Sequence, residues 1–113
     1  MQTDSNETKF QPAQPATIAT LIAYQSGSIV SKEIVKGANG KVMLFAFDEG
    51  EGLSEHTSPF NALVQVVEGE AEVTVSGNPN RVQNGELFLM PANQPHALKA
   101  SKRFKMILTM IRS

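Results

Sequence analysis

The chain has 113 residues, enough for one domain with a single hydrophobic core. It contains no cysteine, which excludes disulfides, thiolate metal sites and a cysteine nucleophile. The formal net charge of -1 gives no reason to expect nucleic acid or an anionic membrane as a partner, because both favour an excess of Lys and Arg. The N-terminus is polar and no apolar run approaches the roughly 20 residues that span a bilayer, so we expect a cytoplasmic protein.

The N-terminal region differs in composition from the rest of the chain. Residues 1–16 hold almost no large apolar side chain and include two prolines, so they cannot build a core of their own. We therefore predict a polar N-terminal tail over residues 1–16 and a single folded domain over residues 17–113. Residues 17–25 place three apolar side chains at helical spacing after Thr17, a residue type that favours N-caps: Ile18, Leu21 and Ile22. This pattern predicts one short helix.

The remainder of the chain consists of short apolar and β-branched runs separated by Gly, Asn and Pro turns. The predicted strands cover residues 28–35, 41–47, 63–68, 71–75, 81–82, 86–90, 97–100 and 104–111. Strands of this length and spacing are typical of a sandwich or barrel. No helix of useful length separates them, which excludes a parallel α/β sheet. The sequence therefore predicts an all-β, antiparallel fold.

Alternation along these strands predicts which side chains face the interior. The expected interior is mostly apolar and either lines a small-molecule pocket or fills a core: Phe45, Phe47, Val64, Val66, Phe88, Met90, Leu98 and Met106 or Met110. The opposite face of residues 104–111 carries Ile107 and Ile111. These two residues either pack on the N-terminal helix or are covered by a second subunit, and we predict a homodimer.

Two histidines, His56 and His96, occur in the chain, and each stands in a similar frame of glycine and proline. The first frame begins at Gly50, places His56 and then Ser58 and Ala62, and ends at Gly69. The second begins at Gly85, continues through Pro91 and Asn93, and places His96 three residues after Asn93. Across residues 28–111 this arrangement resembles the two motifs of the cupin superfamily. The resemblance implies an antiparallel jelly-roll β-barrel with one short N-terminal helix.

The resemblance also implies a set of metal-binding positions. In metal-binding cupins the ligands are two histidines and a glutamate of the first motif and one histidine of the second. Carried over to this chain, the positions hold His56, Ser58, Ala62 and His96. A serine hydroxyl is a poor neutral ligand and alanine offers no donor, so two ligands remain. Catalytic zinc and non-haem iron sites take three protein ligands.

Three functions are therefore open from the sequence. In the first, the chain is a cupin-domain protein of unassigned activity that binds a small molecule in the barrel, with His56 and His96 as polar contacts. The other residues expected to line that ligand site are Ser58, Val64, Phe88, Met90, Leu98 and Met106. In the second, it is a metal-dependent enzyme of dioxygenase or isomerase type whose two histidines hold Fe, Mn, Ni or Zn. In the third, it is a ligand-sensing or structural dimer.

One basic group also stands out near the C-terminus: Lys99, Lys102, Arg103 and Lys105. The simplest interpretation is a solvated hairpin. A second interpretation is a site for an anionic substrate, since clustered cations attract negative charge.

Overall fold

The fold is described from a computed structural model, which describes residues 10–112. Most of the predicted tail, residues 1–9, lies outside the described residues. The elements are a 3-10 turn η1 (Ile18–Thr20) and the strands β1 (Ile29–Gly37), β2 (Gly40–Phe47), β3 (Gly52–His56), β4 (Asn61–Glu68), β5 (Glu70–Val75), β6 (Asn78–Gln83), β7 (Leu87–Met90), β8 (His96–Lys99) and β9 (Phe104–Ile111). Within this part of the chain no helix is long and apolar enough to cross a membrane.

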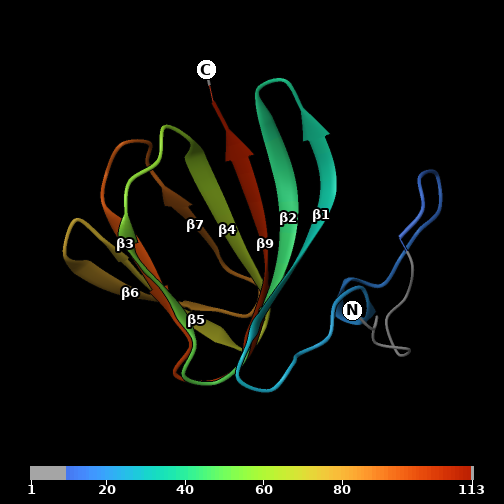
Figure 1. The fold of residues 1–113 in the computed structure, drawn as a ribbon, viewed down its shortest axis with the longest axis horizontal. Helices are drawn as coiled ribbons and strands as arrows, with labels where there is room; N and C mark the ends of the chain where they lie inside the picture. Colours follow the sequence, from blue (N-terminus) through green and yellow to red (C-terminus); the bar gives the residue numbers. More distant parts are fainter. Residues whose placement is uncertain (1–9, 113) are drawn as a thin grey trace.

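The strands form two antiparallel sheets. Sheet A has the order β1-β2-β9-β4-β7 and sheet B the order β3-β8-β5-β6. Figure 1 shows the strands converging at one end of the molecule and spreading apart at the other. The spread end, called the open end below, carries the β1–β2 turn, the β3–β4 loop, the β7–β8 loop and the end of β9 (Figure 1). The predicted all-β class and jelly-roll architecture are confirmed.

The main core fills the space between the two sheets. Its largest buried side chains include Phe47 and Phe104, whose rings stack with centroids 4.5 Å apart. The predicted interior positions are confirmed. Six are buried in this core, namely Phe47, Val64, Val66, Met90, Leu98 and Met106. Three more pack against it while keeping some exposed surface, namely Phe45, Phe88 and Met110.

A second, smaller core lies on the outer face of sheet A. Here Leu21 and Ile22 pack on Leu44 and Ala46, and Ile107 packs against the same cluster within the chain. The side chains of Lys32 and Lys105 reach across and donate hydrogen bonds to the carbonyl oxygens of residues 21 and 19, at 2.6 and 2.7 Å. The N-terminal segment is thus fastened to the sheet by both apolar and polar contacts.

The predicted helix over residues 17–25 is reduced to the single turn η1. Thr17 precedes this turn but makes no side-chain capping hydrogen bond. Ile18 is 37% exposed, whereas the consecutive residues Leu21 and Ile22 are buried. Leu21 and Ile22 pack on sheet A, so tertiary contact and not a continued helix determines the conformation here.

The glycines of the two motifs have a local physical role. Gly50, Gly69 and Gly85 have φ angles of 89°, 77° and 89°, a region that favours residues without a Cβ. A Cβ on Gly69 would also lie 2.3 Å from the carbonyl oxygen of Arg103. Asn93 has a φ of 68°, which asparagine tolerates better than most residues.

The β5–β6 hairpin is tighter than the sequence indicates. The sequence predicts a turn over residues 76–80, but the turn is two residues, Ser76 and Gly77, both with positive φ. Strand β6 therefore begins at Asn78 and includes Pro79, at the edge of sheet B. Strand β3 was not predicted at all, since its residues are mostly exposed and lack a clear alternation.

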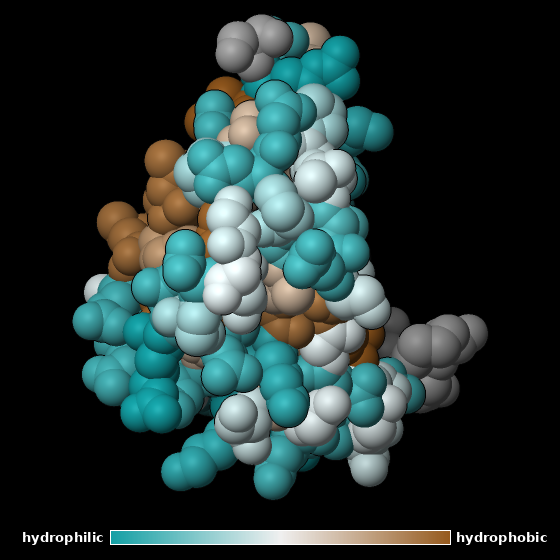
Figure 2. Space-filling model, turned by 90° about the vertical axis from the view of Figure 1, so that its left-hand side faces the viewer, coloured by the Kyte–Doolittle hydropathy of each residue, from teal (hydrophilic) through white to brown (hydrophobic). Residues whose placement is uncertain are grey.

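Part of the outer face of sheet A lies outside the cluster formed with residues 16–24. Strand pairing places one row of side chains across all five strands: Val35, Val42, Thr109, Leu63 and Leu89. Val35 and Leu89, at the two ends of this row, are 58% and 52% exposed. Figure 2 shows that apolar side chains reach the surface in patches between hydrophilic regions. We call the row formed by Val35, Val42, Thr109, Leu63 and Leu89 the outer row.

Candidate functional site

The two histidines meet at the open end of sheet B. Strands β3 and β8 pair so that His56 stands opposite His96, after a register irregularity between Leu53 and His56. Such irregularities bend a strand and re-aim its side chains. The imidazole centroids are 4.4 Å apart, with the ring planes inclined by 66°. His96 is 5% exposed whereas His56 is exposed, so the pair runs from the interior to the surface.

Hydrogen bonds to the backbone select the same tautomer for both rings. Nδ1 of His56 lies 2.8 Å from the carbonyl oxygen of Ser54, and Nδ1 of His96 lies 3.1 Å from that of Gln94. A carbonyl oxygen only accepts, so each Nδ1 carries the proton and, in the neutral ring, each Nε2 keeps its lone pair. The two rings can therefore accept hydrogen bonds or donate lone pairs at Nε2.

The other two motif positions do not complete a metal site. The Oγ of Ser58 accepts a hydrogen bond from the amide of Phe60 at 3.1 Å, and the Ser58 carbonyl accepts one from the amide of Asn93 at 2.7 Å. Ser58 therefore ties the β3–β4 loop to the β7–β8 loop. Ala62 is buried and has no donor atom. Among residues 10–112 no group of three His, Asp or Glu side chains is placed to hold a metal. The donor set does not fit a site with three protein ligands.

The predicted apolar lining residues divide by depth. Val64 and Met106 are completely buried, and Met90 and Leu98 nearly so, which leaves them beneath the surface of the core. Phe88 is half-buried. Interior side chains that keep exposed surface include Met43, Phe45, Leu53, Phe88 and Met110. A ligand at the open end would therefore meet these side chains before the deeper ones.

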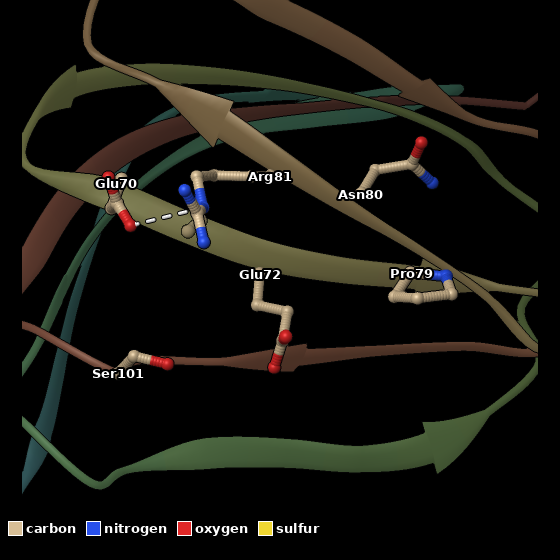
Figure 3. Close-up of a pocket in the computed structure, with 7 residues that line it drawn as sticks. Glu70, Glu72, Pro79, Asn80, Arg81 and Ser101 are labelled. Carbon is tan, nitrogen blue, oxygen red and sulfur yellow. Dashed lines mark ion pairs between the residues drawn. The ribbon is translucent and has the colours of Figure 1, made fainter.

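Four cavities are lined by residues of the described part of the chain, and none of these four is lined by His56 or His96. One, of about 260 Å³, lies on strands β5 and β6 of sheet B and is lined by Glu70, Ala71, Glu72, Pro79, Asn80, Arg81 and Ser101. Figure 3 shows the ion pair between Glu70 and Arg81 at its side, with an N–O distance of 3.4 Å. Exposed pairs of this kind contribute little free energy. Two further cavities of about 380 and 370 Å³ lie on the outer faces of sheets B and A.

The fourth cavity lies at the open end and has a volume of about 170 Å³. It is lined by Lys36, Gly37, Ala38, Gly40, Lys41, Phe60 and Arg112. Its three cations were not predicted as a site, because they belong to no motif and Arg112 lies far from Lys36 and Lys41 in the chain.

In the basic group near the C-terminus, Lys99 and Lys102 are exposed, whereas Arg103 and Lys105 make structural contacts. Arg103 forms an ion pair with Asp48, with an N–O distance of 3.2 Å. Lys105 is 7% exposed, and its Nζ lies 4.9 Å from the ring centroid of Tyr24. Burial and a hydrogen bond to Glu68 raise the pKa of the Tyr24 hydroxyl well above its usual range. Two of the four predicted cations thus hold the N-terminal segment and the loop after β2.

Comparisons with known proteins agree with this architecture. The family model described as a cupin domain matches residues 43–112. A conserved protein of unknown function from Streptococcus pyogenes superposes with a TM-score of 0.88 at 27% identity, covering 99% of this chain and 98% of that one. A cupin superfamily protein from Desulfitobacterium hafniense has the same fold, with a TM-score of 0.84 at 24% identity over 96% and 97% of the two chains.

A cupin 2 conserved barrel domain protein from Leptotrichia buccalis is 40% identical, with a TM-score of 0.80. The match covers 83% of this chain and 46% of that protein, so this chain spans about half of its length. Among curated proteins no match is found. Because the cupin model matches more than half of the residues, the chain belongs to the cupin family.

Proposed function

We propose that this cupin binds a small molecule at the open end of the barrel, with His56 and His96 as its polar contacts. The observation that carries the proposal is the pair of imidazoles 4.4 Å apart whose Nδ1 atoms are both bonded to backbone carbonyls. This arrangement directs two Nε2 lone pairs away from the backbone. Polar groups of this kind fix the orientation of a ligand that otherwise makes apolar contacts.

The apolar contacts are supplied by interior side chains that stay partly exposed. Met43, Phe45 and Met110 lie on the inner face of sheet A, and Leu53 lies on β3 of sheet B, opposite Leu98. In a fully filled barrel, inward side chains would be buried on all sides. Their partial exposure therefore supports a ligand site between the sheets at this end.

Proton NMR tests the proposal directly, because two histidines give two imidazole Hε1 signals. A library of small metabolites is added in groups, and the signals are assigned with a His56→Gln variant. A genuine ligand shifts both signals, and His56→Gln weakens its binding while Glu55→Gln, a neighbouring exposed change, leaves it intact. A compound that binds tightly without moving either signal would contradict the proposal.

The alternative function is that of a metal-dependent enzyme of dioxygenase or isomerase type, and it requires ligands that the donor set lacks. The protein is incubated with Fe, Mn, Ni or Zn, desalted and analysed for metal, with His56→Ala measured in parallel. We expect a small fraction of one equivalent per chain in both proteins, because two imidazoles hold a metal weakly. One full equivalent, lost in His56→Ala, would favour the enzyme.

We further propose a homodimer in which the outer row of one chain packs on that of a second copy. The outer row crosses five strands and its members carry no charge, so a two-fold axis can place it against itself without complementary charges. Sedimentation at micromolar concentration is expected to give a dimer, and Leu89→Lys a monomer. A monomeric wild-type protein would reject this assembly. If the protein also senses a ligand, ligand binding should shift the monomer–dimer equilibrium.

A further inference from the structure

Three cations gather at the open end on the inner side of sheet A. Lys41 lies on β2 with the same orientation as the interior residues Met43 and Phe45, and Lys36 stands directly opposite it on β1. Arg112 follows β9 and donates its backbone amide to the carbonyl of Asn39 at 2.7 Å. All three line the open-end cavity of about 170 Å³.

These cations have no carboxylate partner in the described part of the chain. The ion pairs found there join Arg81 to Glu70 and Arg103 to Asp48, and no carboxylate of residues 10–112 lies within ion-pair distance of Lys36, Lys41 or Arg112. Like charges directly opposite each other on paired strands are destabilising. The Lys36–Lys41 pair is therefore a cost to the free protein that a bound anion would relieve.

The rest of the cavity suits close approach of a small group. A Cβ on Gly37 would meet no atom within 4 Å, so this glycine is not required by packing and leaves the backbone open to a ligand. The guanidinium of Arg112 lies 5.9 Å from the ring centroid of Phe60, which positions it at the cavity wall. Guanidinium groups match the oxygen geometry of carboxylates and phosphates.

The β3–β4 loop connects this cavity to the histidine pair, because it begins directly after His56 and ends at Phe60. Figure 1 shows that this loop, the β1–β2 turn and the end of β9 share the open end. The open end thus holds both the cationic cavity and the histidine pair.

We infer that the ligand carries a small oxyanion, a carboxylate or a phosphate, held by Lys36, Lys41 and Arg112, and a hydroxyl or N–H group that donates to Nε2 of His56 or His96. This inference rests on the proposed function and specifies its ligand class. It predicts an anionic ligand in place of a purely apolar one.

The test uses the full chain at constant ionic strength, with sodium phosphate and sodium acetate titrated separately. Amide signals of Gly37 and Gly40 report the anion, and the imidazole Hε1 signals report the histidines. Saturable shifts at the glycines are expected with at least one anion, and comparison of the two titrations distinguishes phosphate from carboxylate. Lys41→Gln and Arg112→Gln should each weaken binding roughly tenfold or more, since each removes a charge-assisted contact.

Lys102→Gln is the matched control, because it removes the same charge from an exposed position that does not line the cavity. Unchanged affinity in Lys102→Gln together with weakened affinity in Lys41→Gln supports the site. Equal affinity in all variants, or no saturable shift with either anion, overturns the anion site alone. The imidazole signals are recorded separately, in the titrations with the metabolite library. If a library compound binds but leaves both imidazole signals unchanged, the proposed function fails, whatever the outcome for the anion site.

Discussion

Replacing Gly69 by alanine tests whether the last glycine of the first motif is required by backbone conformation alone or by packing as well. With a φ of 77°, an alanine there costs about 1–2 kcal/mol for the left-handed region. Its Cβ would also lie 2.3 Å from the Arg103 carbonyl oxygen and 3.1 Å from the Cα and Cβ of Phe104. These atoms belong to strand β9 and the residue before it, so relief requires a backbone shift that costs roughly a further 1–3 kcal/mol.

Gly77 provides a matched control. Its φ is 82°, close to that of Gly69, but a Cβ at Gly77 would meet nothing within 4 Å. Gly77→Ala should therefore lose about 1–2 kcal/mol and Gly69→Ala about 2–5 kcal/mol of unfolding free energy. Urea unfolding followed by circular dichroism measures both values, and the two midpoints should differ on the order of 1 M. Equal destabilisation of the two variants, with equal m-values, would refute the steric argument.

Three further predictions concern the parts of the fold that position the site. Lys105→Met should lower stability by about 1–3 kcal/mol, because it removes the hydrogen bond to the carbonyl of residue 19, whereas the exposed Lys99→Met should change it by less than about 0.5 kcal/mol. Equal urea midpoints would contradict this role. Hydrogen bonds hold the pKa of Asp48 below its usual range. The largest effect comes from the Gly27 amide, and the Glu49 amide and the Arg103 guanidinium add to it. Its ionised form therefore stabilises the fold above about pH 4, and this contribution is lost as the pH falls through the lowered pKa. Urea midpoints between about pH 5 and pH 3 should fall less steeply in Asp48→Asn than in the wild type, and identical slopes would count against the contact. For the stacked pair Phe47 and Phe104, a double-mutant cycle with leucine should give a coupling of about 0.5–1.5 kcal/mol, and strict additivity would rule out a specific ring contact.

The fold was predictable because its strongest signals are local. Gly50, Gly69 and Gly85 take positive φ, and a residue type that permits such angles can be recognised without any tertiary information. The same holds for the apolar alternation that places Val64 and Met106 in the interior. Sequence patterns of this kind depend on the period of a strand, which the rest of the molecule does not alter.

Features set by tertiary contact could not be predicted in the same way. The spacing of Ile18, Leu21 and Ile22 resembles a helical face, yet contact with sheet A buries two consecutive residues and leaves the first largely exposed. Strand β3 consists of mostly exposed residues, and it is identified by its pairing with β8 rather than by its own composition.

For the candidate site, the sequence identified the two histidines but not their surroundings. His56 and His96 stand in motifs, and pairing of β3 with β8 brings them together as expected. Lys36 and Lys41 face each other across the β1–β2 hairpin, but Arg112 follows β9, and only the order β1-β2-β9 within sheet A brings it to them. The position of Arg112 beside the two lysines depends on the order of the strands, which no local sequence pattern indicates.

The position of Pro79 in the edge strand β6 has a consequence for self-association. The turn at residues 76 and 77 makes Val75 and Asn78 the hydrogen-bonded pair that closes the hairpin, so the next pair, Thr74 and Pro79, is not hydrogen-bonded to each other. The nitrogen of residue 79 therefore points away from β5, toward the free edge. Since proline has no N–H, an incoming strand finds a missing donor there. The missing donor therefore disfavours pairing of a further strand with this edge of sheet B. Such pairing is the step by which proteins with exposed edge strands aggregate.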